Sequence, residues 1–597
     1  MPRPEDNSWK NQIHTAVLRK QEWEKRFKCR QLEEYYEGFQ WKNVPEGYNP
    51  YTFNEVYSTI AIKISSYLFG HPQYQIESSP GHDDYNLELA SKQAQLKEDV
   101  LNTIILDRRA HYKSEVEQAF KDSWFRFGLV EVGYGADWLE NPRAPKPLKQ
   151  SDREQGIAPD KDKLLEEPKE LPANERIYFK RVIPYRFFTS ECVATHLDQQ
   201  FWIGYYDFIP RGDLLLYKGL KNKDFLERGG SMPAETVNLV TMDEGGEAES
   251  RPSGDNVKVW HIWDIRCSRR FLLLDGDFVT LAERPYSRLP IFDIRWIYRS
   301  RGFYPVPPVF HWLSPQDEVN ESREQLRSHR RRFTRKYQVK EGTVDDVEID
   351  KFASGPDGTV IKYKIEPGIV PIQDANLNPA NDKSFVIAKD EFNILTGTSA
   401  EMRGYADRTT ATQAQLINQK SIIREEYENS KVSDWLCACG REALLVMHEK
   451  FSTGMWVQLS TDVGNFMEEA QAQKPVYVWV TSEDLSDGFD FRISLDITSI
   501  SPIQQDAEQK KFLMFLSVTS QFPQIALSPT LIREAAIRIG YRNEKVIAEF
   551  QKMALLQMMG AYQQAQQSSM GQGMVAQNTP NTGEQITNQL KNQLPQQ

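Results

Sequence analysis

The stretch of residues 409–451 constrains the fold most, because it contains no proline and a single glycine, Gly440. Proline and glycine are the residues that most often end helices, so we expect one continuous helix here. At 1.5 Å per residue it would run about 60 Å. The chain has 597 residues, and single cores rarely exceed about 250–300 residues, so we expect several domains around this helix.

A basic run stands inside an acidic chain. The net charge is −11, yet the segment from Arg323 to Lys340 holds eight basic residues and one acid, Glu324. Local positive charge of this kind suggests an anionic partner that is met at one place. The arginines do not share one tight stripe, which favours contacts with phosphates or between subunits over reading of a DNA groove. A face that is solvated, or paired with acids on a neighbouring subunit, is an equally open interpretation. The residues concerned are Arg323, Arg327, Arg330, Arg331, Arg332, Arg335 and Lys336.

The order of segments around this run is specific. Ser314 and Pro315 provide an N-cap and a first-turn proline, which predicts a helix within residues 311–338. Residues 339–378 are rich in β-formers and turns, residues 379–396 predict a second helix, and residues 397–408 form a loop with two glycines. We expect the apolar side chains of the second helix to lie on one side; they are Phe385, Ala388, Phe392 and Leu395.

The remaining segments predict an α+β protein. Residues 1–310 mix helical periodicity with alternating strand patterns, and residues 409–503 add the long helix and a strand pair that should pack on them. Residues 504–560 are helical in pattern. The segment from Gln557 onward has twelve glutamines and two charged residues, so residues 561–597 are expected to be disordered or to fold only on assembly.

Cysteine content and hydropathy indicate a reducing compartment and no membrane span. The five cysteines are few, odd in number and scattered, which argues against a disulfide framework. The N-terminus is polar and lacks the apolar core of a secretory signal. The best apolar window, residues 60–69, is far shorter than the roughly 20 residues that a bilayer needs. We expect a soluble, intracellular protein.

Motifs of catalysis and of metal or cofactor binding do not stand out in the sequence. It has no phosphate-binding glycine loop, no dinucleotide fingerprint, no zinc-protease helix and no serine-hydrolase elbow. Acidic pairs at Asp345–Asp346 and Glu425–Glu426 are candidates for Mg²⁺ binding in nuclease chemistry. In a chain with 84 acids they are better explained as solvated charge. We therefore expect no catalytic residue, no cofactor and no metal.

Taken together, three segments resemble the portal proteins of tailed bacteriophages. The stretch from Asn49 to Pro72, with its Ser-Tyr-Leu-Phe-Gly-His-Pro ending, is similar to the N-terminal portal helix and turn. The stretch from Tyr304 to Lys336, which begins Tyr-Pro-Val-Pro-Pro, resembles the exit from the wing and the first stem helix. The stretch from Thr396 to Thr412 resembles the tunnel loop and the start of the long helix behind it.

The resemblance implies a portal fold with a mixed α/β wing, a two-helix stem, a small β-rich clip and a mostly helical crown. The implied boundaries are 1–310 for the wing with 409–503 packed on it, 311–338 and 379–396 for the stem helices, 339–378 for the clip, 397–408 for the tunnel loop, 504–560 for the crown and 561–597 for the tail.

It also implies a function. Portals of this type are dodecameric rings at a capsid vertex of the virion, assembled in the host cytoplasm, through which double-stranded DNA is packaged and ejected. The implied partners are the terminase large subunit, head-completion, adaptor or tail proteins, and the major capsid and scaffolding proteins. DNA contact in the tunnel is implied for Arg403, Arg408, Thr409 and Thr410.

Two other classes of function remain open from the sequence. One is a nucleic-acid-processing enzyme, such as a nuclease or a packaging motor subunit, although the missing phosphate loop counts against an ATPase. The other is a structural capsid or adaptor protein that never contacts DNA.

Overall fold

The computed structural model describes a large first unit of the chain, residues 1–460 and 475–501, with gaps. The described residues are 6–42, 44, 46, 48–68, 72–78, 87–141, 170–190, 194–217, 219–224, 256–276, 278–332, 337–355, 359–372, 379–398, 411–458, 477–485 and 491–496, together with 513, 514 and 517. The second unit, residues 461–474 and 502–597, lies almost wholly outside them, as do the predicted crown and glutamine-rich tail.

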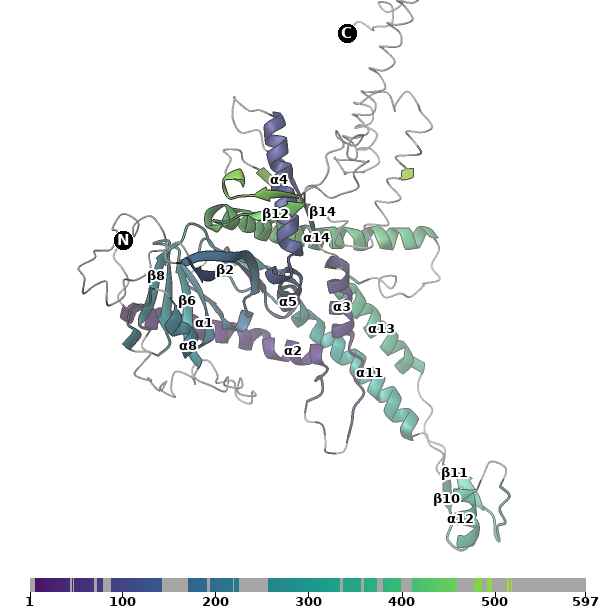
Figure 1. The fold of residues 1–597 in the computed structure, drawn as a ribbon. Helices are drawn as coiled ribbons and strands as arrows, with labels where there is room; N and C mark the ends of the chain where they lie inside the picture. Colours follow the sequence, from purple (N-terminus) through teal and green to yellow (C-terminus); the bar gives the residue numbers. More distant parts are fainter. Residues whose placement is uncertain are drawn as a thin grey trace, which may run out of the picture. The chain divides into compact units, whose positions relative to one another are not determined.

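Helices and antiparallel sheets both occur, which confirms the α+β class (Figure 1). The α-helices are α1 (Asp6–Phe27), α2 (Cys29–Glu37), α3 (Glu55–Tyr67), α4 (Leu87–Leu106), α5 (Tyr112–Phe125), α8 (Arg211–Leu216), α11 (Leu313–Arg332), α12 (Asp346–Ser354), α13 (Pro379–Thr396) and α14 (Ala411–Lys450). Short 3₁₀ turns are η1 (Arg108–Ala110), η2 (Pro184–Arg186), η3 (Pro308–Trp312) and η5 (Glu483–Leu485).

Two sheets organise the N-terminal half. A five-stranded antiparallel sheet has the order β4–β5–β6–β7–β8, and a three-stranded sheet has the order β3–β2–β9. Helix α1 packs on the first sheet, where the Trp9 ring meets Trp202 and Phe271 at centroid distances of 5.9 and 5.6 Å. The strands are β2 (Gly128–Glu140), β3 (Glu170–Arg181), β4 (Phe187–Thr189), β5 (Trp202–Pro210), β6 (Asn256–Asp264), β7 (Arg269–Leu274), β8 (Thr280–Pro285) and β9 (Ile291–Ile294).

Three two-stranded pairs complete the sheet structure. The first joins β1 (Gln73–Ser78) to β14 (Phe491–Asp496), more than 400 residues apart in sequence. The others pair β10 (Tyr337–Val339) with β11 (Ile369–Pro371), and β12 (Met455–Gln458) with β13 (Tyr477–Val480). The chain after the long helix therefore returns to the N-terminal part, as expected for residues 409–503.

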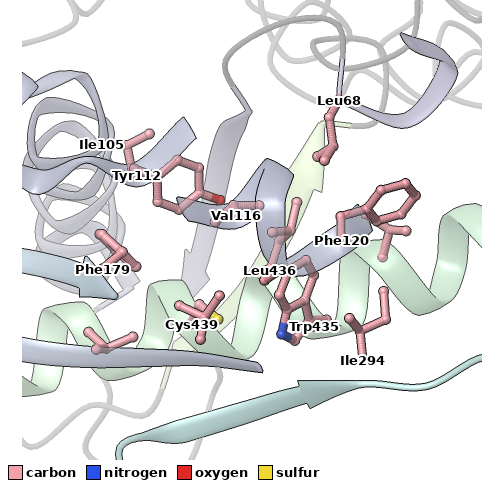
Figure 2. Packing of buried hydrophobic residues seen from close by; sticks show 14 of the residues in the cluster. Leu68, Ile105, Tyr112, Val116, Phe120, Phe179, Ile294, Trp435, Leu436 and Cys439 are labelled. Carbon is pink, nitrogen blue, oxygen red and sulfur yellow. The ribbon is translucent and has the colours of Figure 1, made fainter. Parts of the chain in front are cut away.

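The long helix α14 was predicted correctly, starting two residues later and ending one residue earlier than expected. Its described side chains form the centre of the largest core cluster, which includes Leu436 and Cys439 against Val116 and Phe120 of α5 (Figure 2). Cys439 is fully buried and lies within the cluster as a small core residue.

A column of aromatic rings links this core to η3 and α13. Trp124 stacks on Trp296 with centroids 4.7 Å apart, and it also contacts Trp312 at 5.6 Å. Trp312 in turn meets Phe392 at 6.2 Å. Burial of these large rings fixes where α11 and α13 leave the N-terminal part, because η3 leads directly into α11.

Some expected boundaries were wrong. The helical stretch at the N-terminus is divided into α1 and α2 at Lys28, whose backbone is left-handed with φ 51°. The helix expected within residues 311–338 is α11, which ends at Arg332, and Tyr337 begins a strand because residues 337–339 pair with β11. The segment 339–378, expected to be β-rich, also contains the nine-residue helix α12. The helix expected over residues 379–396 is observed there as α13.

Gly440 generates the first prediction. A Cβ atom there would lie 2.8 Å from the Tyr74 ring and 3.2 Å from Leu101, both fully buried. Gly440→Val should lower the free energy of unfolding by about 2 kcal/mol through overpacking, despite the better helix propensity. Gly212→Val is the control, because its Cβ meets nothing within 4 Å. Equal urea midpoints for the two variants would contradict the proposed close approach.

Candidate functional site

The residues that the portal resemblance assigns to DNA contact, Arg403, Arg408, Thr409 and Thr410, lie outside the described residues. The structure does describe the two ends between which they lie. These are the C-terminus of α13 as far as Thr398, and α14, whose side chains are described from Arg424 onward. The candidate site is therefore built from these two ends and from the helix pair α11–α13.

The end of α13 is a defined helix cap. Gly397 adopts a left-handed backbone with φ 69°, and its N–H donates to the Asn393 carbonyl at 2.9 Å. The hydroxyls of Thr396 and Thr398 are buried and lie 2.8 Å apart. The left-handed backbone favours glycine at this position, and a Cβ on residue 397 would lie 2.8 Å from the Arg424 guanidinium and displace it.

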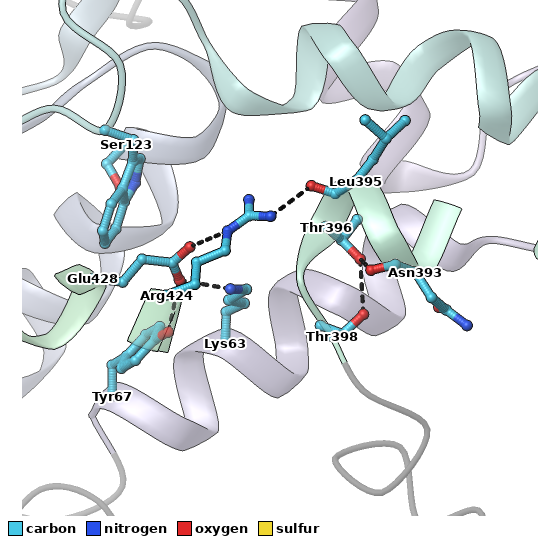
Figure 3. A network of polar contacts seen from close by, with 10 residues as sticks. Lys63, Tyr67, Ser123, Asn393, Leu395, Thr396, Thr398, Arg424 and Glu428 are labelled. Carbon is cyan, nitrogen blue, oxygen red and sulfur yellow. Dashed lines mark hydrogen bonds and ion pairs between the residues drawn. The ribbon is translucent and has the colours of Figure 1, made fainter. Parts of the chain in front are cut away.

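The carboxylate of Glu428 joins three helices at this point (Figure 3). It accepts hydrogen bonds from the Lys63 ammonium and the Tyr67 hydroxyl of α3, each at 2.6 Å. On α14 itself it accepts from Arg424 Nε at 3.3 Å. Arg424 also donates to the Leu395 carbonyl at 3.0 Å, which satisfies one of the carbonyls left open at the end of α13. We call Lys63, Tyr67, Arg424 and Glu428 the junction cluster.

The junction cluster contains buried charged groups. Lys63 and Glu428 have 2% and 7% of their surface exposed. Burial, and then the neighbouring Glu428 charge, raise the pKa of Tyr67 far above its ordinary value, so this phenol stays protonated and donates. Burial also raises the pKa of Glu425, with Lys63 opposing and Glu428 adding to the shift. Removal of Glu428 would leave the buried Lys63 ammonium without the carboxylate that it pairs with.

A row of polar side chains on α11 holds the segment 48–56 against that helix. Gln316 and Asn320 are one helical turn apart and almost fully buried. Gln316 Oε1 accepts from the Glu55 and Val56 N–H groups at 3.0 and 3.2 Å, while its Nε2 donates to the Phe53 carbonyl at 2.8 Å. Asn320 Oδ1 accepts from the Phe53 N–H at 2.9 Å.

Glu324 continues this row by one more turn. It accepts from the Tyr51 N–H at 2.7 Å and from the Tyr48 hydroxyl at 2.5 Å, and Arg327 lies 3.4 Å from it. Burial alone would raise the pKa of Glu324, but the hydrogen bonds from Tyr48 and Tyr51 and the Arg327 charge outweigh it, so its pKa lies below the ordinary value. We call Gln316, Asn320 and Glu324 the α11 polar row.

Two of the basic residues predicted to meet an anionic partner have partners within the chain. Arg327 donates to the Asn49 carbonyl at 3.0 Å, and its guanidinium lies 5.8 Å from the Tyr51 ring. Arg323 lies over the rings of Tyr51 and Phe385. Arg330 is exposed. The side chains of Arg331, Arg332, Arg335 and Lys336 lie outside the described residues.

The sequence interpretation missed these internal roles, and it missed the junction cluster. A signal for the polar row was present, since Gln316, Asn320 and Glu324 recur every four residues on one helical face. The four-residue spacing of Arg424 and Glu428 was visible too, but their partner Lys63 is 365 residues from Glu428 and could not be found from sequence.

Helix α13 exposes a set of apolar side chains. Ala388 and Phe392 are buried against α11 and η3, as expected. Leu395, expected on the same side, is 44% exposed, because the helix turns it away from the packed face. Together with it, the exposed apolar side chains of α13 are Val386, Ile387 and Ile394.

Within the part of the chain that the structure describes, no group of three or more His, Cys, Asp or Glu side chains is placed to hold a metal ion. The Glu425–Glu426 pair does not converge with other acids in this way, and Asp345 instead pairs with Lys364. Among the described helices, none is long and apolar enough to cross a membrane.

Comparison with known proteins does not identify a relative. No protein-family model matches the chain, and no curated protein matches it.

The junction cluster leads to a second prediction. Glu428→Gln should lower the free energy of unfolding by about 3–5 kcal/mol, because Lys63 would remain charged and buried without its partner. The matched control is Glu426→Gln, two residues away and exposed, for which a change within about 0.5 kcal/mol is expected.

A double replacement separates charge from packing. Lys63→Met combined with Glu428→Leu removes both charges and should recover much of the lost stability. If Glu428→Gln unfolds at the same denaturant concentration as the control, the buried pair does not hold the helices together.

The α11 polar row leads to a third prediction, which concerns pH. Because the pKa of folded Glu324 is lowered, its stabilisation is fully present above the unfolded value of about 4.3 and is lost as pH falls through the folded pKa. Glu324→Gln should therefore reduce stability by about 1–2 kcal/mol at pH 7, and this deficit should shrink towards pH 3.

Urea unfolding of wild type and variant at both pH values measures this. The control is Glu321→Gln, on an exposed position of the same helix, which should show no pH-dependent difference. A deficit for Glu324→Gln that grows on acidification would contradict the assignment.

Proposed function

We propose that this chain is the subunit of a portal, a ring-shaped channel at a capsid vertex for packaging and ejection of double-stranded DNA. The observation that carries the proposal is the order and pairing of elements from α11 to α14. Two helices pack side by side, a small subdomain of residues 337–372 lies between them in sequence, and a 40-residue helix begins fifteen residues after the second of them ends. This is the order that the resemblance implies for stem, clip, tunnel loop and the helix behind it.

The way in which the helix pair is anchored supports a stem. Helix α11 is tied to the segment 48–56 by the α11 polar row, and Phe385 of α13 packs on Phe53 at 6.0 Å. The end of α13 is tied to α14 and α3 by the junction cluster. Both helices are thus held firmly at the ends nearest the wing. A channel wall needs such anchoring in order to keep its position while DNA moves past it.

The surface of the pair is suited to contact with other copies. Exposed apolar side chains on α13, such as Ile387 at 56% and Ile394 at 75%, are typical of a surface that another protein covers. In a ring, the neighbouring stem would cover them. The exposed acids Asp390 and Glu391 lie on the same helix as this apolar set, and arginines end α11, so in a ring of identical copies the acids of one stem would face the arginines of the next.

The charge distribution also favours a channel through which DNA passes over a site that binds DNA tightly. Each phosphate that a protein neutralises adds affinity through counterion release, so a channel lined by many free cations would retain DNA. In this chain the net charge is −11, and two of the stem arginines, Arg323 and Arg327, contact aromatic rings or a loop of the same chain. These two arginines are therefore occupied within the chain, and we assign transient contact with DNA to the segment that carries Arg403 and Arg408.

In this proposal residues 1–310 with the later strands form the wing, residues 339–378 dock the terminase and later the head-completion proteins, and residues 504–597 form the crown and its extension. Twelve copies are expected in the ring.

The fourth prediction tests the assigned loop. In a packaging reaction with assembled heads, Arg403→Ala combined with Arg408→Ala should reduce packaged or retained DNA by about tenfold, on the order of two lost phosphate contacts per subunit. Rings should still form. Arg108→Ala, at an exposed arginine of the wing, is the control and should package normally.

Unchanged packaging by the double variant would remove the tunnel assignment. ATP hydrolysis by the purified chain alone, or cleavage of DNA by it, would favour an enzyme instead.

A further inference from the structure

The subdomain of residues 337–372 has almost no core of its own. Of its described apolar side chains only Val344 is buried, and none of the described side chains of α12 is. Segments of about 40 residues or fewer seldom fold stably unless disulfides, metals or association supply what the core lacks. Neither a disulfide nor a metal cluster occurs among the described residues, which leaves association.

An open groove of about 660 Å³ runs along this subdomain. Tyr337 and Phe352 form one wall, with their rings 4.6 Å apart and perpendicular. The rest of the lining is mainly apolar and consists of Val344, Ile361, Tyr363, Pro367, Gly368 and Ile369, with Glu366 as the charged member. An apolar groove of this size has room for several side chains and is unfavourable when filled only with water.

The same subdomain also exposes an apolar side chain, Val347, on a face that does not line the groove. Val347 in the first turn of α12 is 76% exposed. It is five residues before Phe352, and therefore about 140° around the helix from the side chain that lines the groove. It cannot fill the groove of its own chain from this position.

The charges around the two features are complementary. Val347 is flanked on the outer face of α12 by the exposed acids Asp346 and Asp350. Beside the groove, the segment that contributes Ile361 and Tyr363 carries the exposed lysines Lys362 and Lys364. Lys364 already pairs with Asp345 of the same chain, so this segment is known to accept an acid from the α12 region.

We propose that the groove of one copy receives Val347 and the outer face of α12 from the next copy. This inference rests on the proposed function, since it names the partner surface of the predicted clip. Groove and helix face are different surfaces, so the contact is heterologous, and a chain of such contacts closes into a ring when the rotation per subunit allows it. Each copy then completes the core that its neighbour lacks.

Cysteine cross-linking of the full-length protein tests the contact. With Asp346→Cys and Lys362→Cys in the same chain, oxidation should link copies head to tail into a ladder of dimers, trimers and larger species on a non-reducing gel. Each single variant should give no ladder. Wild-type protein is oxidised in parallel, because Cys267 is exposed.

Assembly of a second pair of variants measures the contribution of the valine. Val347→Asp should raise the concentration for half-maximal assembly by about tenfold or more, because it would place an unpaired carboxylate in an apolar groove. Val360→Asp is the matched control, since Val360 is equally exposed at 78% in the same subdomain and has no part in the contact; it should assemble as wild type.

The outcomes separate this inference from the proposed function. Rings without a ladder, or rings lost with Val360→Asp instead of Val347→Asp, overturn the contact but leave the portal proposal intact. Dimers from Asp346→Cys alone indicate a twofold contact and also overturn it. Neither rings nor a ladder at any concentration overturns both.

Discussion

The buried carboxylate of Glu428 is the point at which α3, α13 and α14 meet. Two charges and a phenol are removed from water there, and their hydrogen bonds compensate for the lost hydration only while all the partners keep their places. The Arg424 side chain links this cluster to the end of α13, because it donates a hydrogen bond to the Leu395 carbonyl. Since the segment that follows α13 carries the residues proposed to touch DNA, the junction cluster fixes the helix end from which that segment begins.

Helix boundaries were predicted correctly where local residue preferences decide them. The 40-residue helix α14 follows from the absence of proline, and α13 begins at Pro379 and ends before Gly397, whose left-handed backbone is a helix stop. The break at Lys28 and the early end of α11 could not be predicted, because neither position has a proline or glycine. Tyr337 leaves the helical pattern to pair with Pro371, a contact made across more than thirty residues.

The candidate site likewise combines features that the sequence predicts with contacts that only the folded chain brings together. Sequence reveals that arginines cluster near residue 330, but it does not reveal what each guanidinium contacts. Arg323 and Arg327 turn out to hold a loop and two aromatic rings, because Tyr51 and Phe385 are brought beside α11 by folding. The α11 polar row could have been recognised by its spacing, whereas its partners are backbone groups of residues 51–56, which only the fold brings to that face.

The central claim is that α11 and α13 form part of the wall of a closed ring. Electron microscopy of the purified full-length protein tests this most directly. We expect ring particles with an axial channel, about twelve copies in each, and class averages in which the α11–α13 pair surrounds the channel. Monomers or globular dimers at every concentration, or rings with this helix pair on the outer surface, would contradict the account.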